Sequence, residues 1–240
     1  MSNIIHILNK RIALTQHVGG FQTSIDAVLL AAACPAHAGE RLLDLGCGVG
    51  SASLAALKRI ENTTLTGIDI LPEVVELAKH NARLNAMVER TDFQCIDVRD
   101  FEDLSFDHVI CNPPFLDAGE HVRSPSQAKA TAMGFGEDDM DLKDWVDCAH
   151  RSIAGQGSLT LIHRADQIDE IIRAMGKRFG AVEIIPLWPK AGQEAKRVIV
   201  RARKHRKSPA RIHAGIVLHQ ENGDYTAHAE NILREIAPIA

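Results

Sequence analysis

The stretch Leu42-Leu43-Asp44-Leu45-Gly46-Cys47-Gly48-Val49-Gly50 decides the fold of this 240-residue chain. An apolar run typical of a buried strand passes directly into a turn with three glycines. Because glycine has no Cβ atom, such a turn can bend sharply and a ligand can approach its backbone closely. A dinucleotide-binding loop of the form G-x-G-x-x-G would need its third glycine at Ser51, and Asp44 would repel a diphosphate. The loop therefore favours a ligand with an ammonium group.

On both sides of this loop, short apolar runs alternate with longer helical patterns, which is typical of βαβ units and a mainly parallel sheet. Seven strands are expected, at 41–45, 64–68, 92–96, 106–110, 158–163, 181–187 and 196–203. Helices are expected at 72–85, 141–152 and 166–179, the last with Asp166 as its N-cap.

The connection between the last two expected strands contains Trp188-Pro189 and Gly192 and is too short for a helix, so the final strand should be antiparallel. The predicted fold class is α/β: a Rossmann-like sheet of seven strands, mostly parallel with an antiparallel last strand, and helices on both faces. The length suits a single domain, with a core at 41–203, an N-terminal extension at 1–40 and a C-terminal extension at 204–240. A long irregular loop is expected at 119–141.

Composition excludes several classes of protein. Charged residues form 24% of the chain and apolar residues 45%, which is typical of a folded globular protein and not of a disordered one. No apolar run reaches the roughly 18 residues of a membrane span, and the polar N-terminus differs from a signal peptide, so we expect a cytoplasmic protein with no membrane partner. The five cysteines lack a C-x-x-C pair and the histidines lack H-x-x-x-H spacing, so we expect no metal. The oligomeric state stays open.

Charge is distributed unevenly along the chain. The net charge is −4, yet residues 177–211 carry eleven Lys and Arg against two acidic residues, a net charge of +9, which leaves −13 elsewhere. No acidic residue interrupts the run from Lys196 to Arg211, so pairing within the run cannot neutralise it. Because a surface patch, and not the mean charge, decides which polyanions bind, this run is a candidate phosphate-binding surface. A solvated charged strand would carry the same residues.

Acidic residues follow three successive expected strands, at the edge of an α/β sheet where ligands bind. Asp44 precedes the glycine loop, and Asp69 closes the next strand, where it can accept hydrogen bonds from two ribose hydroxyls. Asp97, beside Val98, can reach an adenine amino group. Each carboxylate alone would also suit a helix cap or a solvent-facing loop. Together with the glycine loop, the three favour an adenosine that carries a cationic amino-acid tail.

The tetrapeptide Asn112-Pro113-Pro114-Phe115 directly follows the fourth expected strand. An amino nitrogen conjugated to a π system is a poor nucleophile. The Asn112 side-chain oxygen and the Pro113 carbonyl can accept its two N–H hydrogen bonds and direct its lone pair at a methyl sulfonium, while Phe115 can stack on the planar group. Proline keeps the turn rigid, so transfer depends on orientation without a strong base. Alone, the motif would also suit a proline turn that ends a strand.

On these motifs the chain resembles class I S-adenosylmethionine-dependent methyltransferases. The resemblance implies S-adenosylmethionine as the cofactor, bound by Thr23, Asp26, Asp44, Gly46, Cys47, Gly48, Gly50, Asp69, Ile70, Asp97, Val98 and Asn112. It implies Asn112, Pro113, Pro114 and Phe115 as the catalytic residues. In this class, [ND]-P-P-[FYW] marks enzymes that methylate the amino groups of adenine, some guanines or glutamine amides.

Segments outside these motifs resemble the bacterial tRNA(Val) adenine-N6 methyltransferases. They are 186–203, 223–226 and 19–30, the last of which passes beside the cofactor in that family; its Thr23-x-x-Asp26 also matches a helix-capping box. The segment Met133-Gly134-Phe135 departs from the family, which has a histidine-containing segment there. The implied reaction is methylation of the N6 amine of an adenine in a single-stranded tRNA loop, the anticodon loop. The implied RNA contacts are Arg197, Arg201, Arg203, Lys204, Arg206 and Lys207.

Three other functions are compatible with the same motifs. A glutamine-N5 methyltransferase that acts on a protein such as a release factor would use the same tetrapeptide, although that family carries a helical domain before its glycine motif and only 41 residues precede Leu42. A DNA adenine methyltransferase would need a separate target-recognition domain. An inert cofactor-binding module would not need Asn112 and Phe115.

Overall fold

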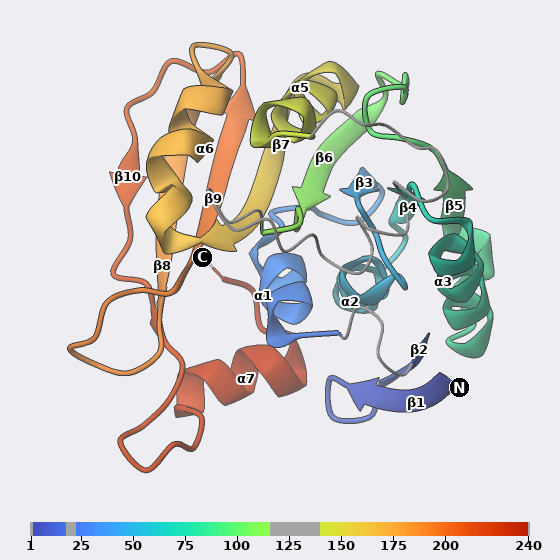
Figure 1. The fold of residues 1–240 in the computed structure, drawn as a ribbon, viewed down its shortest axis with the longest axis horizontal. Helices are drawn as coiled ribbons and strands as arrows, with labels where there is room; N and C mark the ends of the chain where they lie inside the picture. The colour runs from blue at the N-terminus through green and yellow to red at the C-terminus, as the bar shows by residue number, and fades with distance from the viewer. Residues whose placement is uncertain (1, 18–22, 116–139, 240) are drawn as a thin grey trace.

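The computed structural model describes residues 2–17, 23–115 and 140–239, and its centre is a nine-stranded sheet (Figure 1). The strands run in the order β10-β8-β9-β7-β6-β3-β4-β5, and β11 also pairs with β8. Their bounds are β3 (Arg41–Leu45), β4 (Thr64–Asp69), β5 (Thr91–Cys95), β6 (Phe106–Cys111), β7 (Ile153–Arg164), β8 (Phe179–Trp188), β9 (Arg197–Lys204), β10 (Arg211–Ile212) and β11 (Ile216–Val217). Neighbours are parallel except around β9, which is antiparallel to both β7 and β8.

The α/β class, the mostly parallel sheet and the antiparallel β9 are confirmed, and the seven expected strands correspond to β3 through β9. The strand count of seven is wrong, because β10 and β11 add two short parallel strands beside β8. A two-residue strand is too short to show a periodicity. The sequence reasoning also missed the hairpin of β1 (Ser2–Ile7) and β2 (Ile12–His17), which pair with each other as a separate two-stranded sheet.

Helices cover both faces of the sheet, as predicted (Figure 1). They are α1 (Ile25–Ala33), α2 (Ser51–Arg59), α3 (Pro72–Leu84), α5 (Leu142–Ser152), α6 (Ile168–Met175) and α7 (Ala227–Glu235). Successive strand residues point to opposite faces, so Leu42 joins the apolar core shared with α1, α2 and α7, whereas Leu43 joins the core shared with α5 and α6. Burial of each such side chain contributes roughly 1.5–3 kcal/mol, so the two cores hold the layers together.

The helix predicted at 166–179 is shorter in the structure. The helix α6 ends at Met175 because Gly176 adopts a positive φ of +53°, and Phe179 already begins β8. The prediction of Asp166 as the N-cap is wrong, since Gln167 occupies that position and Asp166 instead forms an ion pair with Arg164. Only α5 among the expected helices begins with the full capping chemistry, a reciprocal box between Asp141 and Asp144.

The C-terminal helix α7 packs on α1 (Figure 1). Ala229 and Ile232 are fully buried there, and the backbone N–H of Ile239 donates to the carbonyl of Ala32 at 2.9 Å. The C-terminal segment therefore shares the core that α1 and α2 form on one face of the sheet. No helix in the described parts of the chain is long and apolar enough to cross a membrane.

The topology determines which residues meet at the ligand-binding edge. Because β3, β4, β5 and β6 are parallel, the segments that follow them lie along one edge of the sheet. Since β9 runs the other way, its first residue, Arg197, lies at this edge, and its last, Lys204, lies at the opposite edge. The strand rises about 3.3 Å per residue, which separates the two by about 23 Å.

Candidate active site

The glycine loop after β3 has a backbone that only glycine adopts readily. Gly46, Gly48 and Gly50 have φ angles of +68°, +55° and +84°. A Cβ atom on Gly46 would lie 2.8 Å from the ring of Trp145, a residue of α5. Gly50 is the N-cap of α2 and has no side chain to satisfy the first N–H groups of the helix. The loop thus presents bare backbone at a helix N-terminus, and Cys47 beside it is buried.

Asp69, at the end of β4, holds this loop in place. Its carboxylate accepts the N–H of Gly48 at 3.0 Å through Oδ2 and the N–H of Leu71 at 3.0 Å through Oδ1. Burial raises the pKa of Asp69, an effect that these hydrogen bonds oppose. Each carboxylate oxygen still has acceptor capacity for a ligand hydroxyl. Asp69 and the half-buried Ile70 next to it therefore join the loop to the expected ribose position.

Asp44 lies beneath the loop and is only 2% exposed. The Ser53 hydroxyl donates to its Oδ2 at 2.5 Å. Burial raises the pKa of Asp44 to about 7; the Ser53 hydrogen bond lowers it and the nearby charge of Asp69 raises it further. Asp44 therefore changes its charge close to neutral pH, and a neighbouring cation would favour its ionised form.

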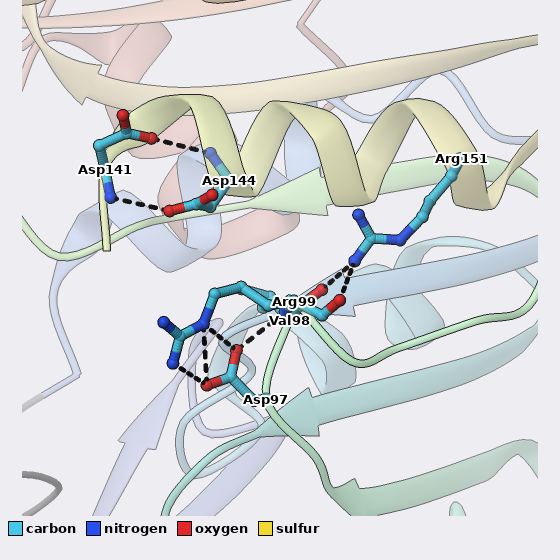
Figure 2. A network of polar contacts seen from close by, with 6 residues as sticks. All are labelled: Asp97, Val98, Arg99, Asp141, Asp144 and Arg151. Carbon is cyan, nitrogen blue, oxygen red and sulfur yellow. Dashed lines mark hydrogen bonds and ion pairs between the residues drawn. The ribbon is translucent and has the colours of Figure 1, made fainter. Parts of the chain in front are cut away.

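Asp97, after β5, is part of a loop that Arg99 and Arg151 hold in place (Figure 2). The Arg99 guanidinium pairs with the Asp97 carboxylate at 2.7 Å, while Arg151 of α5 donates to the carbonyls of Val98, Arg99 and Phe101. Partial burial raises the pKa of Asp97, but the hydrogen bonds from Arg99 outweigh it and lower the pKa on balance. Asp97 thus stays ionised, and Val98 is anchored in the core. Sequence reasoning missed both arginines, because nothing local links Arg151 to this loop.

The tetrapeptide after β6 contains an unpaired acceptor. Oδ1 of Asn112 is buried and has no hydrogen-bond partner among the described residues. Buried polar atoms without a partner are rare in folded proteins, so each one calls for an explanation. Pro113 is buried beside it, and Pro114 and Phe115 are half-buried. The arrangement leaves an acceptor ready for a donor that none of the described residues supplies.

Phe115 contacts two residues from other strands. The guanidinium of Arg197, at the start of β9, lies 4.5 Å from the centre of the Phe115 ring. The ring of His163, near the end of β7, lies 4.9 Å away in an edge-to-face arrangement with an interplanar angle of 76°. Burial, with the Arg197 charge as a second cause, lowers the pKa of His163 to about 4, so His163 is neutral at physiological pH.

The segment that precedes α1 reaches the glycine loop. The Thr23 hydroxyl lies 2.7 Å from the Ser51 hydroxyl at the start of α2, and the buried Asp26 pairs with Arg197 at 3.4 Å. The capping-box alternative for Thr23 is wrong, because Ser24 is the N-cap of α1 and accepts from the Asp26 N–H. Residues 18–22 and 116–139 lie outside the described residues. They include residues 19–22 of the family-like segment 19–30, most of the predicted loop 119–141 and Met133-Gly134-Phe135.

The basic run that is continuous in the sequence is divided by the fold. Arg201 is largely buried, pairs with Glu183 at 2.6 Å and donates to the carbonyls of Ala33 and Ile239. Lys204 donates to the carbonyls of His150 and Ile153 at 2.7 Å each, at the C-terminal end of α5. Arg201 and Lys204 therefore form ion pairs or hydrogen bonds within the chain.

The other predicted RNA contacts separate into two places. Arg203, Arg206 and Lys207 are exposed, at the end of β9 and in the turn after it. They lie at the opposite sheet edge from Asn112 and Phe115, whereas Arg197 lies beside Phe115 itself. The physical reason is the antiparallel direction of β9, which carries the two ends of the basic run to opposite edges. No cluster of three or more metal-ligating side chains occurs in the described ranges.

Comparisons with known proteins agree with this geometry. A family model described as the methyltransferase small domain matches residues 14–130. A tRNA1(Val) (adenine(37)-N6)-methyltransferase of Shewanella baltica is 26% identical over 225 residues, which cover 90% of this chain and 92% of that protein.

Two solved structures are also similar. The crystal structure of a predicted O-methyltransferase from Agrobacterium tumefaciens is 27% identical, with a TM-score of 0.73, and the match covers 90% of this chain and 98% of that one. The 16S rRNA N2 G1207 methyltransferase of T. thermophilus, in complex with AdoMet and guanosine, is 18% identical with a TM-score of 0.59. That match covers 85% of this chain and 50% of the other, and it shows a shared fold.

Proposed function

We propose that this chain, an S-adenosylmethionine-dependent methyltransferase, methylates the exocyclic N6 amine of an adenine in tRNA, in the anticodon loop of tRNA(Val). The name of the Shewanella baltica relative, which matches nearly the whole chain, supports this substrate. The Oδ1 of Asn112 is the observation that carries the amino-group chemistry, because an amine has N–H groups to donate and this buried oxygen receives none from the described residues.

The residues at the carboxyl edge of the sheet fit the cofactor. The glycine loop would accommodate the amino-acid part, since it has no side chains in the way and the ionised Asp44 lies beneath it. Asp69 would accept the ribose hydroxyls, and Asp97 with Val98 would meet the adenine. When bound, the cofactor supplies a methyl group on a positively charged sulfur.

The tetrapeptide performs the orienting step. Asn112 Oδ1 and the Pro113 carbonyl accept the two N–H groups of the amine, which turns the nitrogen lone pair out of conjugation and toward the methyl carbon. Transfer to this nitrogen would form a C–N bond as the C–S bond of the cofactor breaks, after which the nitrogen would lose one proton to water. Phe115 supports the planar base by stacking. These residues bind and orient the amine, so the reaction needs no strong base.

The exposed cations at the far edge suit an extended polyanion. We propose that Arg203, Arg206 and Lys207 contact RNA phosphates away from the modified base. Arg201 and Lys204 are not among these contacts, because Arg201 pairs with Glu183 and Lys204 donates to backbone carbonyls of the chain. A folded RNA is long enough to span the roughly 23 Å between the two sheet edges.

Incubation with labelled S-adenosylmethionine and either total tRNA or a protein lysate tests the proposed function. Label in tRNA that digests to N6-methyladenosine is the expected product. Label in a glutamine side chain would favour the release-factor type of activity, and a 2′-O-methyl nucleoside would show that oxygen, and not an amine, is the acceptor. Either of these products contradicts the proposal.

We predict that the affinity for S-adenosylmethionine rises with pH through about 7, because Asp44 attracts the cationic cofactor only when ionised. The dissociation constant should fall by up to about tenfold between pH 6 and pH 8, as measured by calorimetric titration. In Asp44→Asn it should be higher and independent of this ionisation. The amino group of the cofactor itself titrates near pH 8, so the readout is the difference in the pH dependence of the dissociation constant between the wild type and Asp44→Asn. Parallel pH profiles of the two proteins would contradict the role of Asp44.

The same group predicts a stability profile for the cofactor-free protein. The folded pKa of about 7 lies above the unfolded value of 3.8, so the folded state binds more protons between these pH values. The free energy of unfolding should therefore fall as pH rises from about 4 toward 7. Asp44→Asn should lose this contribution, which chemical denaturation at several pH values measures.

We predict that replacing Arg203, Arg206 and Lys207 by glutamine raises the KM for tRNA and lowers its salt dependence. Each lost phosphate contact reduces the slope of log KM against log salt by roughly 0.7–0.9, so the loss of three contacts reduces it by about 2.1–2.7. A control variant with glutamine at the exposed Lys10, Lys58 and Arg83 carries the same change in net charge on other elements. Equal effects of both variants would show that only the total charge matters.

A further inference from the structure

The ring of Phe115 is held from outside its own loop. The Arg197 guanidinium lies 4.5 Å from the ring centre, over its face, and His163 meets the ring edge to face at 4.9 Å. These partners come from β9 and β7, which are adjacent and antiparallel and place Arg164 opposite Arg197. One face of the aromatic ring is therefore already covered by a planar cation, and a base can stack only on the rest of the ring surface.

Arg197 is itself anchored on its other side. Its Nε lies 3.4 Å from Oδ2 of Asp26, whose side chain is 12% exposed, and its Nη1 donates to the carbonyl of Lys196 at 3.1 Å. Asp26 belongs to the first turn of α1, and Thr23, two residues before this helix, contacts the start of α2 beside the glycine loop. Arg197 thus joins the cofactor side of the site to the tetrapeptide through two contacts of different kinds.

We propose that Arg197 is a positioning residue that fixes the Phe115 ring for stacking against the acceptor base, and that Asp26 holds Arg197 in that position. This inference rests on the proposed function, because it assigns to Phe115 the support of a planar acceptor. It replaces the expectation that Arg197 contacts RNA phosphate. The guanidinium is only about one-third exposed, with its face on the ring and its edge on a carboxylate.

The geometry of the guanidinium is needed, and not only its charge. A planar cation stacks on an aromatic face while its N–H groups donate in the plane, whereas an ammonium group is a compact point charge. Lysine at position 197 would keep the charge but lose the simultaneous contacts to Phe115 and Asp26. A phosphate contact, in contrast, tolerates lysine well.

Steady-state kinetics separates these two roles. We expect Arg197→Ala and Arg197→Lys to lower kcat about tenfold or more, with the KM for tRNA within about twofold and an unchanged salt slope. Lys58→Ala removes an exposed charge at the end of α2 that is distant from the glycine loop and is the matched control, with kcat as in the wild type. In a Phe115→Leu background, Arg197→Ala should have little further effect on kcat. A raised KM, a reduced salt slope and rescue by Arg197→Lys would overturn the proposal.

A spectroscopic measurement does not depend on any substrate. The seven phenylalanines of the full chain can be replaced by fluorophenylalanine, and the Phe115 signal assigned by its loss in Phe115→Leu. Arg197→Ala and Asp26→Asn should shift or broaden this fluorine resonance in the free protein, and Lys58→Ala should not. An unchanged Phe115 resonance in Arg197→Ala would overturn the positioning role. Failure of the wild type to methylate tRNA would instead contradict only the proposed function.

Discussion

Replacement of Asn112 by alanine should abolish methyl transfer while cofactor binding persists. We expect kcat to fall about 10³-fold or more, because orientation of a poorly nucleophilic amine is the main contribution of the tetrapeptide. The dissociation constant for S-adenosylmethionine should stay within about threefold, since Oδ1 of Asn112 makes no hydrogen bond to the glycine loop. Single-turnover kinetics with labelled cofactor, together with calorimetry, measures the two quantities separately.

The unpaired state of Oδ1 adds a stability readout to this experiment. A buried acceptor without a partner costs roughly 1–3 kcal/mol, so its removal should leave the melting temperature unchanged or raise it. The matched variant Asn112→Asp keeps an acceptor oxygen in nearly the same volume and should retain more activity than Asn112→Ala. Equal losses of cofactor affinity and kcat, or a large drop in melting temperature, would show that Asn112 is a structural residue.

Replacement of Asp69 by alanine should have the largest effect on cofactor binding. Its carboxylate accepts N–H groups from Gly48 and Leu71, so alanine removes a ribose acceptor and also releases the glycine loop. We expect the dissociation constant for S-adenosylmethionine to rise about 100-fold, which is about 2.7 kcal/mol. The loss of two hydrogen bonds to a charged acceptor should also lower stability by about 2 kcal/mol or more.

Calorimetric titration and chemical denaturation distinguish these two consequences of losing Asp69. Asp69→Asn is the matched control, because its amide oxygen can still accept one backbone N–H while its NH₂ group cannot accept the other. It should lie between the wild type and Asp69→Ala in both measurements. Unchanged affinity in Asp69→Ala would remove this residue from the cofactor site.

Much of the core could be predicted because its signals are local. The strand before the glycine loop, Leu42 to Leu45, is an apolar run, and its alternate residues do enter two different cores. The positive φ angles of Gly46, Gly48 and Gly50 agree with the residue type at each position. Such runs also show where each strand ends. Because Asp44, Asp69 and Asp97 come at the ends of three successive strands, the sequence was enough to expect these carboxylates along one edge of a parallel sheet.

Elements without a local signal were missed. The strands β10 and β11 have two residues each and exist only because β8 offers a free edge. Arg99 and Arg151 stabilise the loop after β5 from positions that no motif connects (Figure 2). Asp166 has the residue type of an N-cap but pairs with Arg164 instead. The partners of β10, β11 and Arg151 are distant in the sequence, whereas Asp97 and Asp166 pair with arginines that are only two residues away and belong to no motif.

By itself, the sequence determined the α/β class, the ligand-binding loop and the tetrapeptide, because backbone preference and the period of buried residues are properties of short segments. Only the tertiary structure decided the use of each cation in the basic run. Arg201 and Lys204 are used within the chain, Arg203, Arg206 and Lys207 are exposed at the far edge, and Arg197 covers Phe115. The physical reason is strand direction: β9 is antiparallel, a property of pairing between distant segments, and it separates charges that are adjacent in the sequence.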